Sequence, residues 1–258
     1  MLTINNLSKC FYKGTENENI VFNKFNLNIN SGECTAILGS NGCGKSTLFN
    51  IISGILSQDN GDIILSDRNI NNLKENERSK YIGRVHQDPS MGVSPSLTIL
   101  ENISLSDKKG QKFSLKPLVN KNRIEEYVSK LKTLDLGLEN KLNTEVKFLS
   151  GGQRQSLSLL MATFKKPELL LLDEHTAALD PKTSKLIMDK TQELINTHKI
   201  TTMMISHNIR DAINYSDRII MLKKGEIILD VKNGEITEKE IIKIYNSKNE
   251  DHSLLEAI

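Results

Sequence analysis

Residues 39–47 read GSNGCGKST, a stretch that fits the pattern G-x-x-x-x-G-K-[ST]. A nucleoside triphosphate brings several negative charges into one cleft, and backbone N–H groups can surround them only where side chains stay out of the way. Gly39, Gly42 and Gly44 meet that need. The positive end of a helix that follows would point at the phosphates. The stretch therefore predicts a phosphate-binding loop between a strand and a helix.

The side chains at the end of this loop have separate expected tasks. Lys45 would reach the β- and γ-phosphate oxygens, Ser46 would offer its hydroxyl to Mg²⁺, and Thr47 would donate to an α-phosphate oxygen. We therefore expect ATP and Mg²⁺ as the bound cofactors. The remaining loop residues, whose backbone would complete the cradle, are Ser40, Asn41 and Cys43.

Strand and helix patterns flank the loop on both sides. Residues 34–38 (CTAIL) form a short apolar run typical of a buried strand, and residues 48–56 carry apolar side chains at helical spacing. Residues 2–29 contain short alternating stretches, which predict a small antiparallel sheet. These patterns favour an α/β fold. Further strands are expected at 62–65, 82–86, 169–173 and 201–206, and a hairpin at 218–230.

Two acidic residues follow the apolar run at 169–172. In α/β folds, an acid at the end of a buried parallel strand lies beside the phosphate loop. Asp173 would hold Mg²⁺ through its water shell. Glu174, one residue further on, would polarise the water that attacks the γ-phosphate. The pair predicts a hydrolase site.

The charge balance gives no electrostatic footprint for nucleic acid. The chain of 258 residues has 34 Lys and Arg against 32 Asp and Glu, a net charge of +2. Apolar residues make up 38% and charged residues 26%, as in a globular protein. We therefore expect no nucleic-acid partner.

The cysteine spacing argues against zinc-binding and disulfide-stabilised proteins, and the hydropathy argues against secreted and membrane-spanning ones. Cys10, Cys34 and Cys43 match no zinc pattern, and their odd number argues against a disulfide framework. The first residues lack a signal peptide's apolar core, and runs such as 169–172 fall far short of the roughly 20 residues of a membrane span. A membrane role would therefore need other chains to cross the bilayer.

Residues 149–153 read LSGGQ, and with the phosphate loop and the acidic strand end they resemble the ATP-binding-cassette (ABC) family. The resemblance extends over nearly the whole chain. It implies a P-loop NTPase core with an antiparallel β subdomain and an inserted helical subdomain. It also implies that the chain binds and hydrolyses ATP.

Four further residues receive roles from this resemblance. Phe11 falls where the family places an aromatic ring on adenine, with Tyr12 as the alternative. Gln87 matches the glutamine that touches Mg²⁺ and the attacking water. His207, after a predicted buried strand, matches the histidine that contacts the γ-phosphate. Asp180, in the sequence ALD, belongs to the loop that crosses to a partner subunit.

The resemblance also implies that the LSGGQ signature serves a neighbouring chain. Ser150, Gly151, Gly152 and Gln153 would close over ATP bound to a second cassette, arranged head to tail. Ser150 and the helix N-terminus that follows would bind the γ-phosphate there. A single chain would hold an incomplete site, so we expect a second ABC ATPase subunit, most simply another copy of this chain.

One ABC ATPase domain is expected over residues 1–245. Its core with the β subdomain would comprise 1–87 and 166–245, and the helical subdomain 88–165. Residues 246–258 are polar and are expected to form a flexible tail.

Two stretches depart from the common family pattern. Ser156 and Met161 stand where many relatives have Arg, and residues 175–177 read HTA where many have Pro-Thr-Ser. Neither change touches the expected catalytic groups. The sequences LSGGQRQSLSLLMA and LLLLDEHTAALDP together resemble those of ATP-binding subunits of tryptophan/tyrosine-type uptake systems. His175 could contact Glu174 or the partner subunit, or it could simply pack in the core.

Our leading hypothesis is an importer of amino acids or similar small solutes. The chain would be a peripheral subunit at the cytoplasmic face of the cell membrane, bound to transmembrane permease subunits and served indirectly by an extracytoplasmic substrate-binding protein. The motivating features are LTILENI at 97–103 and the single cassette. A soluble ABC ATPase of cofactor-assembly type stays open, as does an exporter or lipoprotein-release subunit.

Overall fold

The N-terminal part of the chain forms a four-stranded antiparallel sheet in the order β2-β1-β4-β5. Alternation places Leu2 and Ile4 of β1 in the core, and a shift of register after Ile4 brings Leu7 to the same side; none of the three side chains is exposed. Ile4 faces Leu27 of β2 in the register, so both strands turn their apolar sides the same way. The predicted antiparallel sheet is confirmed. Its strands are β1 (Leu2–Phe11), β2 (Asn19–Ile29), β4 (Asn60–Leu65) and β5 (Arg68–Asn69).

A second sheet has six strands in the order β10-β9-β3-β8-β7-β6. All neighbouring pairs are parallel except β9 and β10, which form the predicted hairpin. The central strands are buried on both faces, which is why they read as continuous apolar runs. The strands are β3 (Cys34–Gly39), β6 (Ile82–Val85), β7 (Leu169–Asp173), β8 (Thr201–Ile205), β9 (Arg218–Lys223) and β10 (Glu226–Lys232).

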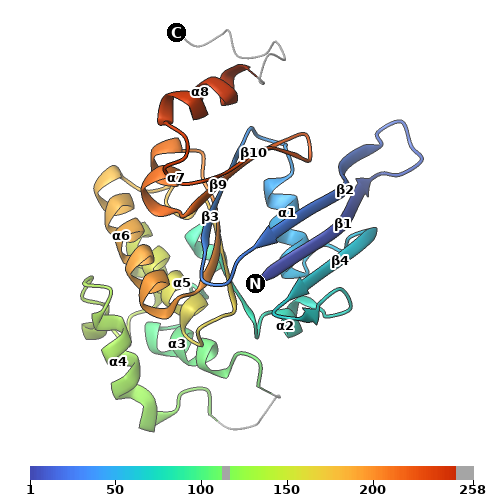
Figure 1. Ribbon diagram of the computed structural model, residues 1–258. Helices are drawn as coiled ribbons and strands as arrows, with labels where there is room; N and C mark the ends of the chain where they lie inside the picture. Colours follow the sequence, from blue (N-terminus) through green and yellow to red (C-terminus); the bar gives the residue numbers. More distant parts are fainter. Residues whose placement is uncertain (112–116, 248–258) are drawn as a thin grey trace.

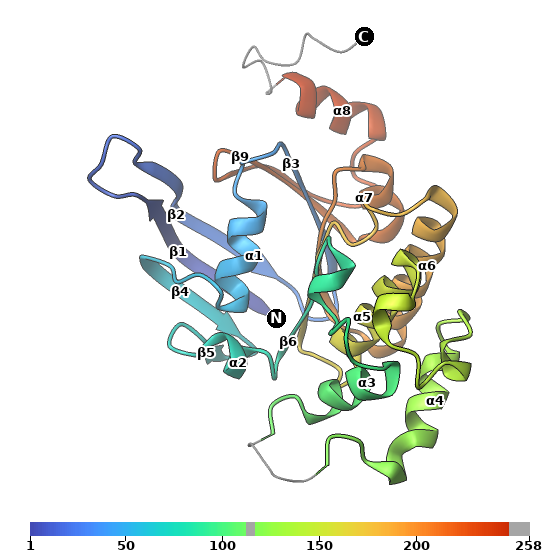
Figure 2. The same ribbon diagram turned by 180° about the vertical axis from the view of Figure 1, so that it is seen from behind.

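Helix α1 (Lys45–Ser53) lies between the two sheets (Figures 1 and 2). Its apolar side chains belong to one buried cluster with residues of both sheets, among them Leu48 with Ile4 and Leu171. Because the helix begins directly after the phosphate loop, this packing fixes the loop at the C-terminal end of strand β3.

The opposite face of the parallel sheet is covered by helices. Leu170 and Leu172 of β7 pack in a cluster that includes Leu159, Met188 and Ala212, each from a different helix. The chain therefore forms layers of helix, parallel sheet, helix and antiparallel sheet. The covering helices are α5 (Gly151–Thr163), α6 (Pro181–His198), α7 (Ile209–Tyr215) and α8 (Glu238–Ser247).

A third buried cluster holds helices α3 (Ile99–Lys108) and α4 (Ile124–Lys132) against α5. Ile103, Tyr127 and Leu157, one residue from each helix, are fully buried in it. The fold class predicted from the sequence, with a helical insertion in an α/β core, is confirmed, while the exact limits 88–165 stay a prediction. The remaining short elements are α2 (Glu75–Arg78) and single turns at Pro89–Met91, Lys121–Arg123, Leu138–Asn140 and Val146–Phe148.

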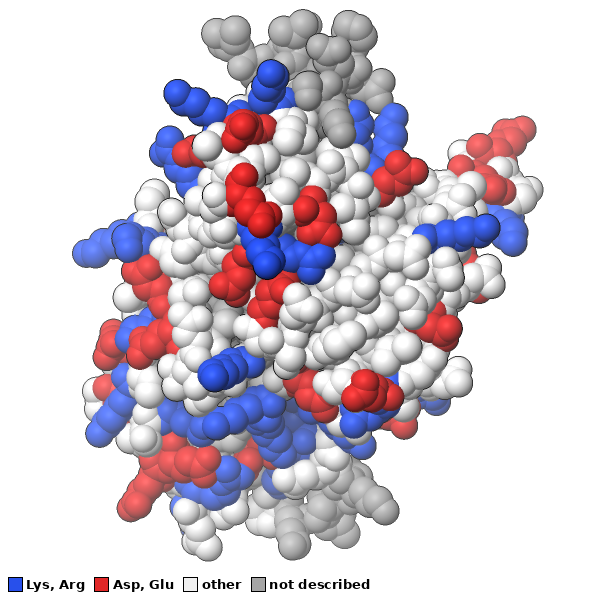
Figure 3. Space-filling view, viewed as in Figure 1, with Lys and Arg blue, Asp and Glu red and all other residues white. Residues whose placement is uncertain are grey.

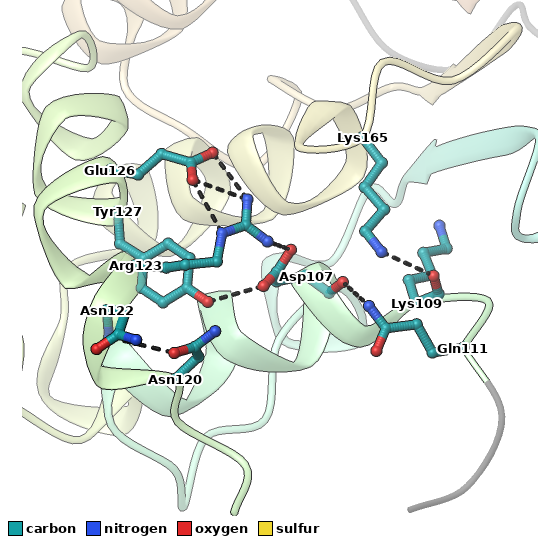
Figure 4. Close-up of polar contacts among 9 residues, drawn as sticks. All are labelled: Asp107, Lys109, Gln111, Asn120, Asn122, Arg123, Glu126, Tyr127 and Lys165. Atoms are coloured by element: carbon teal, nitrogen blue, oxygen red, sulfur yellow. Dashed lines mark hydrogen bonds and ion pairs between the residues drawn. The ribbon is translucent and has the colours of Figure 1, made fainter.

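A polar network at the C-terminal end of α3 orients α4 (Figure 4). The buried carboxylate of Asp107 accepts from the Tyr127 hydroxyl at 2.9 Å and pairs with Arg123. Arg123 also pairs with Glu126, 2.8 Å away, on the exposed side of α4. Burial and then the bond to Asp107 raise the pKa of Tyr127 to about 12, so its hydroxyl keeps its proton to donate. The buried carboxylate of Asp107, which has partners on α4 and at its start, thus links the two helices.

The structure describes residues 1–111 and 117–247. Helix α8 extends to Ser247, so the first two positions assigned to the tail are helical, and 248–258 lie outside the described residues. In the view of Figure 3, acidic and basic side chains are interspersed over the face that the figure shows.

Candidate nucleotide site

The loop at 39–47 has the backbone that its glycines predict. Gly39, Gly42 and Gly44 have φ angles of 152°, 76° and 111°, a region that side chains other than glycine rarely adopt. A Cβ on Gly39 would lie 2.5 Å from the Leu222 carbonyl oxygen, and one on Gly44 would lie 2.8 Å from Cζ of Phe22. A side chain at either end of the loop would therefore clash with its neighbours.

Helix α1 begins without a side-chain cap. Its N-cap residue is Gly44, which has no side chain to bond the first N–H groups. These groups and the positive end of the helix are thus available to an anion such as a phosphate. Ser46 is exposed at this end, and Thr47 is half-buried.

Lys45 is 5% exposed and folds back over its own loop. Its Nζ donates to the carbonyl oxygens of Gly39 at 2.6 Å and Ser40 at 3.0 Å. These bonds curl the loop around the ammonium group. The single positive charge is therefore held at the centre of the expected phosphate cradle.

The sheet topology brings the other expected groups to the same end of the parallel sheet, where its strands have their C-terminal residues. Strands β3, β8, β7 and β6 are parallel neighbours, so the residues that follow them share one end of the sheet. The phosphate loop follows β3, His207 follows β8, Asp173 ends β7 and Gln87 follows β6. The sequence alone could place each group after a strand but not state which strands are neighbours.

Glu174 and His207 form a direct pair. The Glu174 Oε1 atom lies 2.6 Å from Nε2 of His207. Glu174 has a φ of 47°, a left-handed conformation that costs about 1–3 kcal/mol for a residue other than glycine. Its own N–H donates to the carbonyl of Ile205 at 3.2 Å, which ties the strained residue to the end of β8. This backbone turn directs the carboxylate towards His207.

Asp173 pairs with an arginine that our reading of the sequence missed. Nη2 of Arg84, on β6, donates to Oδ2 of Asp173 at 2.9 Å. The detectable signal was a charged residue inside the buried strand IGRV, since buried charges need partners.

The expected metal ligands suit Mg²⁺ by their chemistry. Ser46 supplies a hydroxyl, Asp173 a carboxylate and Gln87 an amide carbonyl, which are all hard oxygen donors. Mg²⁺ is commonly held by one or two carboxylates together with substrate phosphates, and this donor set fits that pattern.

Phe11 lies on the antiparallel sheet, at the end of β1. It is half-buried, and Nζ of Lys9 lies 5.3 Å from its ring centroid. Tyr12 is 72% exposed and has a φ of 53°. The neighbouring strand β2 touches the phosphate loop through Phe22, but the stacking of Phe11 on adenine stays a prediction.

The signature residues have local partners in this chain. Ser150 caps α5: its Oγ accepts from the Gln153 N–H at 3.2 Å, and its N–H donates to Oε1 of Gln153 at 3.1 Å. A Cβ on Gly152 would lie 2.4 Å from Cγ2 of Thr183, whereas one on Gly151 would make ordinary contact. Within the described residues, no hydrogen bond or ion pair joins these four residues to the chain's own phosphate loop.

Asp180 caps helix α6 in the same manner. Its Oδ1 accepts from the Thr183 N–H at 3.1 Å. Hydrogen bonds from Thr183 hold the pKa of this exposed carboxyl below its usual range. The loop before α6 therefore ends in a fixed, ionised residue.

His175 packs in the core of the same chain. Its side chain is buried, and Nε2 lies 3.2 Å from Oγ1 of Thr191. That hydroxyl donates its proton to the Ile187 carbonyl, so it accepts from His175. Burial lowers the pKa of His175 to about 4, which keeps the imidazole neutral. Of the roles left open by the sequence, packing is the one that these contacts support.

Comparisons with known proteins find a family model and relatives that cover most of the chain. The family model described as ABC transporter matches residues 22–177. A tyrosine transport ATP-binding protein of Clostridioides difficile is 46% identical over 245 residues, covering 94% of this chain and 97% of its own length. A phosphonates import ATP-binding protein of Lactococcus lactis is 32% identical, covering 96% of this chain and 100% of its own length.

Solved structures match over almost the whole chain as well. The dimeric cassette MJ0796, in a post-hydrolysis state with ADP and Pi, has a TM-score of 0.77 at 32% identity and covers 92% of this chain and 100% of its own. The protein cbiO1 of Clostridium perfringens, part of the ABC transporter complex cbiONQ, has a TM-score of 0.75 at 30% identity, with 96% and 95% covered.

Proposed function

The chain belongs to the ABC transporter family and is an ATP-binding, ATP-hydrolysing subunit, and on this premise we propose that it drives import of an amino acid or a similar small solute. The observation that carries the substrate class is the 46% identity with a tyrosine transport ATP-binding protein along nearly the full length of both chains.

Hydrolysis would use the pair of Glu174 and His207. Water attacks the γ-phosphorus as the bond to the β-phosphate bridging oxygen breaks, and Glu174 accepts the water proton. His207 fixes the Glu174 carboxylate through the 2.6 Å contact between Nε2 and Oε1. Its contact with the γ-phosphate, implied by the family resemblance, stays a prediction. Lys45 and the N–H groups of α1 would neutralise the charge on the phosphates. Bound Mg²⁺, held by Ser46, Asp173 and Gln87, would supply Lewis-acid stabilisation of the phosphate oxygens.

A second subunit would complete the site. Ser150 and the start of α5 make no polar contact with the phosphate loop within the described residues. The N-terminus of α5 is suited to bind a γ-phosphate presented by a neighbouring cassette. The dimeric form of the similar cassette MJ0796 supports this arrangement. ATP would then join two subunits, and hydrolysis would release them.

The transmembrane partner would be a permease bound near α3. No helix within residues 1–111 and 117–247 is both long and apolar enough to cross a bilayer. A groove of about 410 Å³ runs between α3 and α5 and is lined by Leu105, Lys109, Met161 and other residues. Leu105, 42% exposed, presents its apolar side chain on this groove, where a permease segment could contact it. The chain would thus lie peripherally at the cytoplasmic face of the membrane.

Substitution of the expected general base tests the ATPase mechanism. Glu174→Gln removes the proton acceptor but keeps the shape, so ATP should still bind, turnover should fall by at least about 100-fold, and a dimer should accumulate. Turnover would be measured by phosphate release and the dimer by size-exclusion chromatography with ATP. Glu226→Gln, on the exposed hairpin, is the matched control and should behave as wild type. A normal turnover rate in Glu174→Gln would refute the assigned role.

Reconstitution tests the direction and the cargo. The chain would be co-purified with its membrane partners and placed in proteoliposomes with the associated binding protein. ATP-dependent uptake of labelled tyrosine or another amino acid is expected. Uptake of phosphonate or spermidine instead would correct the substrate class, and efflux would favour the exporter alternative. If no membrane partner co-purifies, the soluble cofactor-assembly alternative gains support.

A further inference from the structure

Strand β6 carries one charged side chain, Arg84, within the sequence IGRV. The strand is parallel to β7 at the side of the sheet, and Arg84 pairs in register with Leu171. Only 11% of the Arg84 side chain is exposed. A charge so far removed from water requires partners that compensate for lost hydration.

The partners of Arg84 come from the two elements that build the nucleotide site. Nη2 donates to Oδ2 of Asp173 at 2.9 Å. Nη1 donates to Oδ1 of Asn50 at 2.7 Å and to Oγ of Ser53 at 3.2 Å. Asn50 and Ser53 lie on helix α1, on the face that begins with Ser46 at helical spacing. One planar guanidinium therefore joins the helix after the phosphate loop to the acid at the end of β7.

We propose that Arg84 is a positioning residue for Asp173. Held by α1, the guanidinium binds one carboxylate oxygen, Oδ2, and fixes the carboxylate so that the other oxygen, Oδ1, is left for the water shell of Mg²⁺. The inference rests on the proposed hydrolysis of magnesium-bound ATP. It adds a residue that touches neither the nucleotide nor the metal.

The geometry favours positioning over stabilisation of the fold. A buried ion pair contributes little net stability, because desolvation of both charges offsets their attraction. The Nε atom of Arg84 is also buried without an acceptor among the described residues, which adds to this cost. What the pair does achieve is a fixed orientation of the carboxylate, and partners of metal-binding groups tune metal affinity in that way.

An experiment on magnesium dependence separates the two roles. The affinity for the non-hydrolysable analogue AMP-PNP would be measured by calorimetry with Mg²⁺ and with EDTA, for wild type, Arg84→Met and Arg84→Lys. In Arg84→Met we expect the gain in affinity from Mg²⁺ to fall by about 10-fold or more, with binding in EDTA unchanged. Arg84→Lys keeps the charge without the fork that bridges α1 and Asp173, so an intermediate loss is expected.

Arg218→Met is the matched control. Arg218 is also a mostly buried arginine, 18% exposed, and it pairs with Asp230 at 2.6 Å and with Glu33 at 3.3 Å outside the nucleotide site. The Arg218→Met substitution should lower the unfolding temperature and leave the effect of Mg²⁺ on AMP-PNP affinity unchanged.

Three results would overturn the proposal, and a fourth would overturn the proposed function on which it rests. One is wild-type or tighter Mg²⁺-dependent binding in Arg84→Met. Should that variant fail to fold, a wild-type Mg²⁺ effect in Arg84→Lys would decide against it equally. Finally, wild-type protein that binds AMP-PNP equally well in Mg²⁺ and EDTA would remove the metal assignment itself, and failure to bind AMP-PNP at all would remove the proposed function.

Discussion

Replacement of the buried imidazole by Leu in His175→Leu should remove part of the acid sensitivity of the fold. His175 is 2% exposed, and its one polar contact among the described residues is with Thr191. Thr191 already donates to the Ile187 carbonyl at 2.7 Å, so its proton stays satisfied without the imidazole. Leu has a similar volume and carries no group that titrates. The variant therefore isolates the titration of one group.

The sign and size of the effect follow from the pKa of His175, lowered by burial from 6.5 to about 4. Between these values the unfolded chain binds the proton more readily than the folded chain. The stability contributed by the neutral imidazole is thus complete above about pH 6.5 and is lost as the pH falls towards 4. From about pH 7 to about pH 5, wild type should lose about 2 kcal/mol more than His175→Leu.

Urea unfolding at both pH values, followed by circular dichroism in EDTA without nucleotide, measures this difference. With a slope of about 2 kcal/mol/M, the wild-type midpoint should move about 1 M further than that of His175→Leu. His198→Leu is the control, because burial shifts the pKa of this more accessible histidine in the same direction but less strongly. Parallel loss of stability in wild type and His175→Leu would show that His175 is not held neutral.

Three further substitutions test the loop and the signature. Lys45→Ala removes the point charge from the cradle and should abolish ATP binding in a fluorescence titration, and wild-type affinity would contradict the assignment. Ser150→Arg should leave nucleotide binding by the monomer intact and abolish turnover, and normal phosphate release would refute the shared site. Gly152→Ala places a Cβ 2.4 Å from Cγ2 of Thr183 and should destabilise the fold by about 1–3 kcal/mol in thermal unfolding. Adding Thr183→Ser, which deletes that methyl group, should restore most of the loss, and no rescue would place the strain elsewhere.

The pattern of apolar residues was sufficient to predict the main elements. The run CTAIL before the loop is strand β3, and the run LLLL before Asp173 is strand β7, because strands buried on both faces carry apolar residues without alternation. The alternation in residues 2–29 likewise predicted β1 and β2. These signals are local, so each can be read without knowing which strands are neighbours.

Contacts between distant segments could not be predicted in this way. Arg84 meets Asp173 across 89 positions of sequence and Asn50 across 34, and no local pattern links them. The left-handed backbone of Glu174 is equally hidden, because its sequence neighbourhood contains no glycine to announce a turn. Family resemblance gave Gly152 a role towards ATP, whereas the structure adds its close approach to Thr183 on α6.

Each charged group expected to meet the nucleotide already has a partner in its own chain. Lys45 donates to two carbonyls of its loop, Asp173 accepts from Arg84, and Glu174 lies 2.6 Å from Nε2 of His207. These contacts set the groups in place before a ligand binds, which lowers the reorganisation needed during reaction. They differ in what the ligand must replace. The carbonyl partners of Lys45 are neutral, so phosphate oxygens would form stronger, charge-assisted bonds with it. The carboxylates, by contrast, have cationic or N–H donors that can remain bound to one oxygen while the other serves metal or water. The loop should therefore respond to ATP, while the acidic pair should keep its geometry.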